Sequence, residues 1–125
     1  MPEEILSGER LPPQAVEVER QVLAAILLDK TALDRVVSLL KPESFYREAH
    51  RQIYQAMLDL YEKGEPVVLV TASEALIKAG QLETIGGRAY LASLLEGVAT
   101  AAHVEHHAKI VLERYVLRKL AQTAT

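Results

Sequence analysis

Three histidines near the carboxyl end come closer to a metal site than any other residues of this 125-residue chain. His103 and His107 are four residues apart, so on a helix both imidazoles share one face and could bind the same metal ion. Glu105 is out of register with the H-E-x-x-H arrangement of metalloproteases. Because no third ligand is evident, the pattern favours solvent-exposed or interface histidines at His103, His106 and His107. A small metal-dependent enzyme that uses His103 and His107 remains an alternative.

Two carboxylates and a fourth histidine lie beside apolar segments. Glu17 and Glu19 flank an apolar face, but a spacing of two residues turns their side chains apart on a helix. We therefore interpret them as surface or partner-contact charges rather than as a catalytic acid and base. His50 precedes Ile53 and Tyr54 in a helical pattern, which favours a half-buried, hydrogen-bonded histidine.

The sequence contains no motif for nucleotide binding or nucleophilic catalysis. The segment from Gly80 to Gly86-Gly87-Arg88 comes nearest to a phosphate-binding loop, but its spacing is wrong and arginine replaces the lysine. No G-x-G-x-x-G pattern occurs, and the absence of cysteine excludes a thiol nucleophile, a disulfide scaffold and a cysteine-bound zinc. The five serines have cap, turn or helix-surface interpretations: Ser7, Ser38, Ser44, Ser73 and Ser93.

Charge argues against a nucleic-acid platform built by this chain alone. Fourteen Lys and Arg against 17 Asp and Glu give a net charge of −3. The basic residues of the last predicted helix are spread around it and are not interleaved with aromatic residues, as single-strand binding requires. These residues are Lys109, Arg114, Arg118 and Lys119.

Length and composition indicate one soluble domain. A chain of this size that is 50% hydrophobic can bury a single core. The amino terminus is acidic and lacks the pattern of a signal peptide. The longest apolar run, residues 22–28, falls short of the roughly 20 residues that a membrane helix needs. We therefore expect a cytoplasmic protein with no membrane partner.

The hydrophobic pattern predicts an all-α fold, a compact bundle of about six helices. Aromatic residues make up only 5% of the chain, so the core must be aliphatic, which favours close-packed helices over a sheet. An extended arm is expected over residues 1–13, a helical globular domain over 14–100, and a long helix over 101–125. The predicted helices span residues 14–28, 31–40, 48–63, 71–79, 88–96 and 101–124.

Local signals set the expected ends of these helices. Thr31 with Asp34, and Thr71 through Glu74, resemble helix-start boxes in which a hydroxyl accepts an unpaired backbone amide. Residues 67–70 read as an extended connector, because one isolated strand has no partner. Gly64 supplies a left-handed stop, and Thr100 caps the last helix.

Two aromatic residues and one stripe are predicted to fill the core. Phe45 and Tyr46 are expected to plug the space between helices. The third helix has a buried stripe at the spacing of three and four residues that a helix requires. Its members are Ile53, Met57, Leu60 and Tyr61.

The last helix carries two apolar stripes, whereas a helix that lies on one core needs only one. The first stripe contains Val104, Ala108, Val111 and Tyr115. The second, on roughly the opposite side, contains Ile110, Leu117, Leu120 and Ala121. We therefore expect the far half of the helix to pack on a second copy or on a following helix of a truncated chain. The alternative is a frayed tail whose apolar residues only look patterned.

Jointly, these motifs resemble the start of DnaB-type replicative DNA helicases, from about Leu11 to Thr125. The matching pieces begin with Leu11-Pro12-Pro13-Gln14, Glu17, Glu19 and the apolar run of residues 22–29. They continue with residues 42–46, His50, residues 53–57, residues 64–67 and residues 69–71. They end with Gly86-Gly87, Tyr90-Leu91 and residues 108–111.

The resemblance implies that this chain is the amino-terminal domain of such a helicase and is non-catalytic by itself. In that family a helical globule is followed by a helical hairpin, hairpins of neighbouring subunits pair, and six subunits form a collar. The collar docks DnaG-type primase, and it affects ring loading, which adds a helicase loader as a further partner. ATP and magnesium belong to a motor domain beyond this chain, which itself is expected to hold no cofactor, no metal and no nucleic acid.

The resemblance also suggests partner-binding residues. Positions that match Glu17 and Tyr90 are associated with primase or helicase coupling, and the second stripe of the last helix adds Ile110, Leu117, Leu120 and Ala121. The sequence departs from the family at four positions, which concern the interface and not the assignment. These are Ala24, Val68, Ala99 and His107. The remaining alternative is a stand-alone helical DNA-binding or regulatory adaptor.

Overall fold

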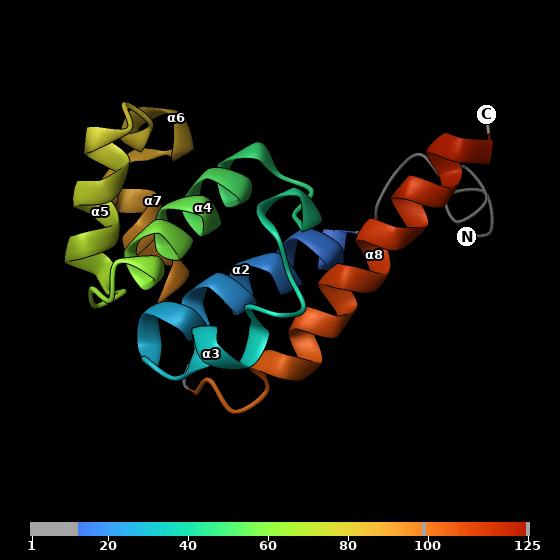
Figure 1. Cartoon of the computed structure of the whole chain (residues 1–125), viewed down its shortest axis with the longest axis horizontal. Helices are drawn as coiled ribbons and strands as arrows, with labels where there is room; N and C mark the ends of the chain where they lie inside the picture. The colour runs from blue at the N-terminus through green and yellow to red at the C-terminus, as the bar shows by residue number, and fades with distance from the viewer. Residues whose placement is uncertain (1–12, 99, 125) are drawn as a thin grey trace.

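The computed structural model describes residues 13–98 and 100–124, and side chains from residue 16 to 98 and from 100 to 122 (Figure 1). The expected arm over residues 1–13 lies outside this part except for Pro13. The predicted all-α class is confirmed, since the described residues form seven α-helices, one 3-10 turn and no strand. The first elements are α2 (Pro13–Leu28), α3 (Ala32–Val36), η1 (Pro42–Ser44) and α4 (Glu48–Glu62). The others are α5 (Leu69–Lys78), α6 (Leu82–Ile85), α7 (Gly87–Leu94) and α8 (Val104–Ala124).

Helix α2 forms the centre of the bundle. It contacts α8, α4, α7 and α3, which explains why residues 22–27 are all buried although they cover every side of the helix. Figure 1 shows α5, α6 and α7 at one end of the molecule and α8 at the other, with α2, α3 and α4 between them. No helix of the described residues has the length and hydrophobicity needed to cross a membrane.

The core confirms most of the predicted stripe on α4. Ile53, Met57 and Leu60 are buried. Tyr61 was wrongly placed in the stripe, because its ring is 37% exposed and its hydroxyl donates to Asp34 Oδ1 at 2.5 Å. That hydrogen bond raises the pKa of the tyrosine hydroxyl.

The aromatic plug consists of one residue of the predicted pair. The ring of Phe45 is fully buried and lies 4.9 Å from the ring of Tyr54, whose hydroxyl donates to the carbonyl of Leu40 at 2.9 Å. Burial raises the pKa of the Tyr54 hydroxyl. The next residue, Tyr46, is 44% exposed, because successive side chains of an extended segment point in opposite directions.

Helix α3 is shorter than predicted and starts without the expected cap. Thr31 makes no side-chain cap hydrogen bond and has a helical backbone, while its amide and its hydroxyl both donate to Asp29 Oδ1, at 2.9 Å each. The helix ends at Val36, where the amide of Leu39 bonds the carbonyl of Val36 in a tighter turn. The chain then leads into Pro42, before which a helical backbone is disfavoured.

Helix α5 begins two residues before the predicted capping box. Residues 69 and 70 belong to the helix and not to an extended connector. The hydroxyl of Thr71 accepts from the amide of Val68 at 3.0 Å and donates to the carbonyl of Pro66 at 2.7 Å. Ser73 instead donates to the carbonyl of Leu69. Thr71 thus closes the first turn from inside the helix. The sequence pattern had placed it before the helix, as its cap.

Helix α6 was not predicted, because four residues are too few to show a period. It separates α5 from α7, and the two glycines at residues 86 and 87 lead into α7 with positive φ angles of 111° and 75°.

The first prediction concerns the aromatic plug. Replacing Phe45 with alanine should lower the free energy of unfolding by about 3–5 kcal/mol, since a fully buried ring leaves a cavity. The matched variant Tyr46→Ala should cost about 1 kcal/mol, because that ring is half exposed and gives up mainly its contact with Arg118. Urea unfolding of both variants tests the difference, and equal losses would contradict this description of the core.

Candidate partner-binding surfaces on α8 and around Tyr90

The first predicted stripe of α8 packs on the globule. Val104, Ala108 and Val111 are buried. Tyr115 is partly buried, and its hydroxyl donates to Glu43 Oε2 at 3.0 Å, which raises the pKa of the hydroxyl. The amino-terminal half of α8 therefore completes the core.

Two arginines hold α8 in place. Arg35 of α3 reaches the carbonyls of Ala101 and Ala102, each at 3.4 Å, just before the helix begins. Arg118 donates to the carbonyl of Ser44 at 3.1 Å, and its guanidinium lies 5.3 Å from the ring of Tyr46. Burial lowers the pKa of Arg118, and the nearby Glu19 carboxylate opposes that shift.

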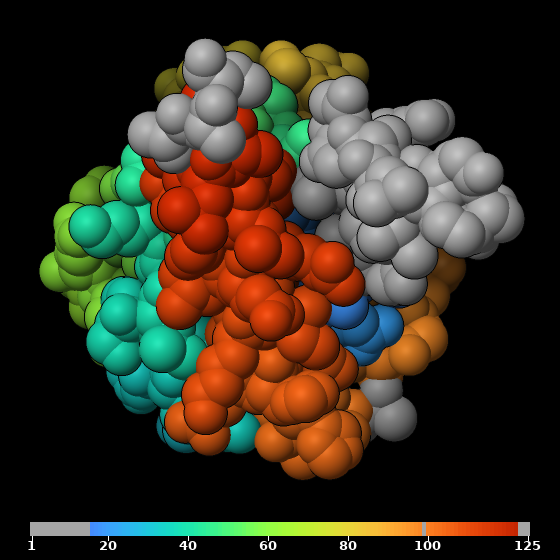
Figure 2. Space-filling view, turned by 90° about the vertical axis from the view of Figure 1, so that its right-hand side faces the viewer, coloured from blue at the N-terminus to red at the C-terminus, as the bar shows by residue number. Residues whose placement is uncertain are grey.

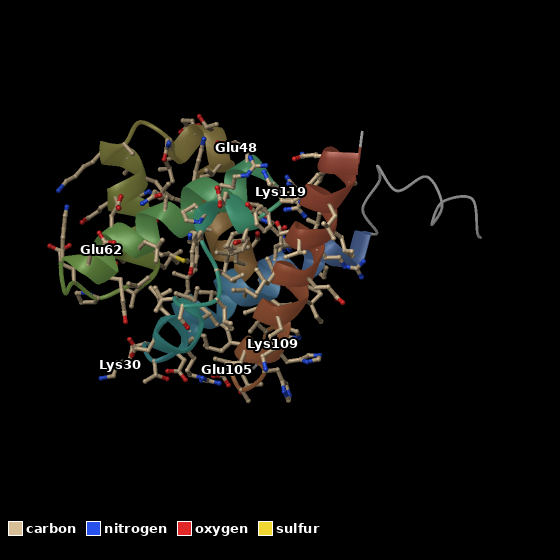
Figure 3. All side chains as sticks on the ribbon, turned by 45° about the vertical axis from the view of Figure 1, so that its right-hand side comes forward. Lys30, Glu48, Glu62, Glu105, Lys109 and Lys119 are labelled. Atoms are coloured by element: carbon tan, nitrogen blue, oxygen red, sulfur yellow. The ribbon has the colours of Figure 1, made fainter. Side chains whose placement is uncertain are left out.

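Thr100 is not the cap of α8, because the helix starts three residues later than the predicted Ala101. The hydroxyl of Thr100 accepts from the amide of Ala102 at 3.1 Å, but the helix starts only at Val104. Thr100 therefore orders the turn before α8. Charged residues occupy exposed positions along the helix, with Glu105 and Lys109 near its start and Lys119 near its end (Figure 3).

The second stripe of α8 faces solvent. Leu117 is 51% exposed and Leu120 60%, Ala121 is exposed, and Ile110 is partly buried. Val116, which lies between the two predicted stripes and was therefore missed, is also 45% exposed. Figure 2 shows α8 running across one face of the molecule. The far half of α8 therefore exposes several large apolar side chains, while Tyr115 and Arg118 on the same half contact Glu43, Ser44 and Tyr46.

Around Tyr90, the structure links the two site residues suggested by the family resemblance. Glu17 is exposed on α2, and its carboxylate lies 3.7 Å from the guanidinium of Arg20. Arg20 Nη1 donates to the hydroxyl of Tyr90 at 3.2 Å, and the guanidinium lies 5.4 Å from the centre of that ring. Glu17 and Tyr90, which are 73 positions apart in the sequence, therefore meet through one arginine.

Behind Tyr90 lies a buried pair, Glu19 and His50. His50 Nε2 is 2.7 Å from the hydroxyl of Tyr90, and Nδ1 is 2.7 Å from Glu19 Oε1. A consistent set of protons has Arg20 donating to Tyr90, Tyr90 donating to Nε2, and Nδ1–H donating to the carboxylate. The rings of His50 and Tyr90 are also nearly parallel, 6.0 Å apart.

Both members of this pair are more deeply buried than predicted. His50 is fully buried, where a half-buried residue was expected. Glu19, interpreted as a surface or partner-contact charge, is only 2% exposed, and this interpretation was wrong. The physical reason is the start of α4, where Glu19 accepts the amides of Tyr46 at 2.6 Å and Arg47 at 3.5 Å. A carboxylate is a favourable partner for unpaired amides at a helix amino terminus.

Of the three histidines near the start of α8, His106 and His107 lie in the helix and His103 lies just before it. His103 and His106 are exposed, and the ring of His107 lies 6.4 Å and 5.8 Å from theirs. Burial, together with the neighbouring His106 and His103, lowers the pKa of His107. In the part of the chain that the structure describes, no group of three or more His, Cys, Asp or Glu could hold a metal ion.

The second prediction concerns the glycine behind Tyr90. A Cβ at Gly86 would lie 2.8 Å from the Tyr90 Cβ, whereas a Cβ at Gly87 meets nothing within 4 Å. Both residues have positive φ, but 75° at Gly87 lies near the left-handed region that alanine can enter, whereas 111° at Gly86 lies well outside it. Gly86→Ala should therefore destabilise the fold by about 1–3 kcal/mol more than Gly87→Ala. Chemical denaturation of both variants gives the difference, and equal stabilities would refute the close contact.

Comparisons with known proteins agree on one family. The DnaB-like helicase N terminal domain family matches residues 11–113. The replicative DNA helicase DnaB of Geobacillus stearothermophilus is 51% identical over 120 residues, which is 96% of this chain and 26% of that protein. The replicative DNA helicase DnaC of Bacillus subtilis is 48% identical, with the same two shares. This chain therefore spans about a quarter of the length of these relatives.

A solved structure extends the agreement to three dimensions. The crystal structure of the N-terminal domain of DnaB helicase from Mycobacterium tuberculosis superposes with a TM-score of 0.87 at 43% identity. The match covers 91% of this chain and 81% of that one. The sequence, the family match and the fold lead to the same conclusion: this chain belongs to the family of DnaB-like helicase N-terminal domains.

Proposed function

We propose that this chain is the N-terminal collar domain of a hexameric, ATP-dependent replicative DNA helicase. It joins subunits, docks a DnaG-type primase at the replication fork and contributes no catalytic residue. A helicase loader is a further partner. ATP and magnesium act in a motor domain outside these 125 residues. The proposal is supported by relatives that are replicative DNA helicases and by family membership over residues 11–113.

The exposed apolar face on the far half of α8 carries this proposal. Val116, Leu117 and Leu120 are all 45% or more exposed on one helix, while the opposite side of the same helix packs on α2. Each large aliphatic side chain that becomes buried on association contributes about 1.5–3 kcal/mol. We propose that a second copy of this chain covers this face.

A stand-alone DNA-binding adaptor receives less support from the same helix. Arg118, which would be part of a basic face on α8, is bound to the carbonyl of Ser44 and stacked near Tyr46 and Tyr115. The guanidinium of Arg118 is therefore already engaged by residues of this chain. The net charge of the whole chain, −3, also opposes binding to a phosphate backbone.

The third prediction tests self-association. The double variant Leu117→Asp and Leu120→Asp should keep the helical circular-dichroism signal and lose self-association in sedimentation velocity, because charges in an apolar interface cannot be desolvated without a partner. The matched control is Val70→Asp with Ile77→Asp on α5, at the other end of the molecule, where the side chains are 61% and 47% exposed. Equal behaviour of the two double variants would refute the assignment of the interface to α8.

The fourth prediction tests primase docking at Glu17. Glu17→Gln should weaken binding of the source organism's primase by about tenfold, the effect of one interface residue worth about 1.4 kcal/mol. Glu83→Gln on α6 makes the same change at another exposed carboxylate and should leave the affinity unaltered. Isothermal titration calorimetry with purified primase measures both affinities. No binding by the unaltered chain would refute the proposed docking.

A further inference from the structure

Arg20 occupies the space between the two residues proposed to contact the partner. It lies one helical turn after Glu17 on α2, so both side chains emerge on the same side of the helix. Its guanidinium is placed over the Tyr90 ring and bonded to the Tyr90 hydroxyl, and its side chain is only 28% exposed. The carboxylate of Glu17, at 62% exposure, is the part of this group that faces solvent most.

The proton and one lone pair of the Tyr90 hydroxyl are used inside the chain. With His50 neutral and its Nδ1–H donating to Glu19, the hydroxyl proton lies in the 2.7 Å bond to His50 Nε2. One of its lone pairs accepts Arg20 at 3.2 Å. His50 cannot turn its ring without losing both this bond and its bond to Glu19, which would leave buried polar atoms unpaired.

These contacts determine which chemical groups the surface around Tyr90 presents to a partner. Tyr90 is held at its hydroxyl by Arg20 and His50, and Arg20 also lies over one face of its ring. Glu17 is linked to this group through its contact with Arg20. A partner at this place meets the Glu17 carboxylate and the exposed part of the Tyr90 ring, and no free hydroxyl donor.

We propose that Arg20 and His50 are positioning residues of the partner surface. Arg20 holds Glu17 and Tyr90 in one arrangement, and His50 keeps the Tyr90 hydroxyl turned inward. Neither residue needs to touch the partner, because each acts through a neighbour that does. This inference rests on the proposed docking of primase at Glu17 and Tyr90.

The fifth prediction is that Arg20 and Glu17 act as one unit. Arg20→Gln should weaken primase binding by about tenfold, as Glu17→Gln does, and the double variant should bind no more weakly than either single one. Arg88→Gln on α7 is the matched control, since it removes an exposed arginine from the helix that carries Tyr90. Arg20→Lys should recover part of the affinity, because it keeps the charge and one donor but not the planar stack.

The outcomes separate this inference from the function on which it rests. If the unaltered chain binds primase and Glu17→Gln weakens it, but Arg20→Gln behaves like Arg88→Gln, the positioning role is refuted and the docking stands. Additive losses in the double variant also refute it. If the unaltered chain does not bind primase, the docking and the positioning role fall together.

A spectroscopic measurement tests the His50 part without any partner. In a long-range proton–nitrogen spectrum, His50 should show a protonated Nδ1 and a bare Nε2, the tautomer that lets it accept from Tyr90. Tyr90→Phe removes the donor, keeps the ring, and should shift the Nε2 resonance while leaving Nδ1 protonated. A protonated Nε2 in the unaltered chain would overturn the inward orientation of the hydroxyl.

Discussion

The arrangement of α2, α4 and α7 depends on one buried carboxylate. Glu19 leaves α2 and enters the core, where an unpaired charge would be very costly. Its oxygens accept the amides of Tyr46 and Arg47 at the start of α4 and the Nδ1–H of His50, so a single side chain satisfies groups of two backbone residues and one side chain. Since His50 in turn accepts from Tyr90 on α7, three helices are joined by hydrogen bonds at one point.

The buried pair of Glu19 and His50 also positions residues at the surface of the molecule. Glu19 binds the amide of Tyr46, and the ring of Tyr46 is where Arg118 of α8 stacks. On the other side, His50 orients Tyr90, which holds Arg20 and through it Glu17. The buried pair thus lies between the two candidate partner surfaces, and both are built on residues that it holds.

Periodicity was enough to predict the class of the fold and most of its helices, because α2, α4 and α8 are long enough to show their patterns. It failed where the deciding partner is distant in the sequence. The spacing of Glu17 and Glu19 correctly predicted that the two side chains point apart. That Glu19 is buried depends on its bond with the amide of Tyr46 at the start of α4, which lies 27 positions later. Arg20 carried no signal at all, since an arginine on a helix surface is ordinary. Thr71 was wrongly predicted to be the cap of α5, because a hydroxyl can close the first turn from inside the helix as well as from the cap position.

Helix α8 has a mechanical property that follows from its composition. Its 21 residues, about 31 Å in length, contain neither glycine nor proline, so it has no site at which a kink would form easily. One end is clamped in the core by Val104, Ala108 and Val111, and the other end is exposed. Such a helix is a stiff rod that is attached to the globule from its buried start to the contact of Arg118 with Ser44. A force on its carboxyl-terminal turns is therefore passed on to α2, on which the helix packs, and is not absorbed by a kink within the helix.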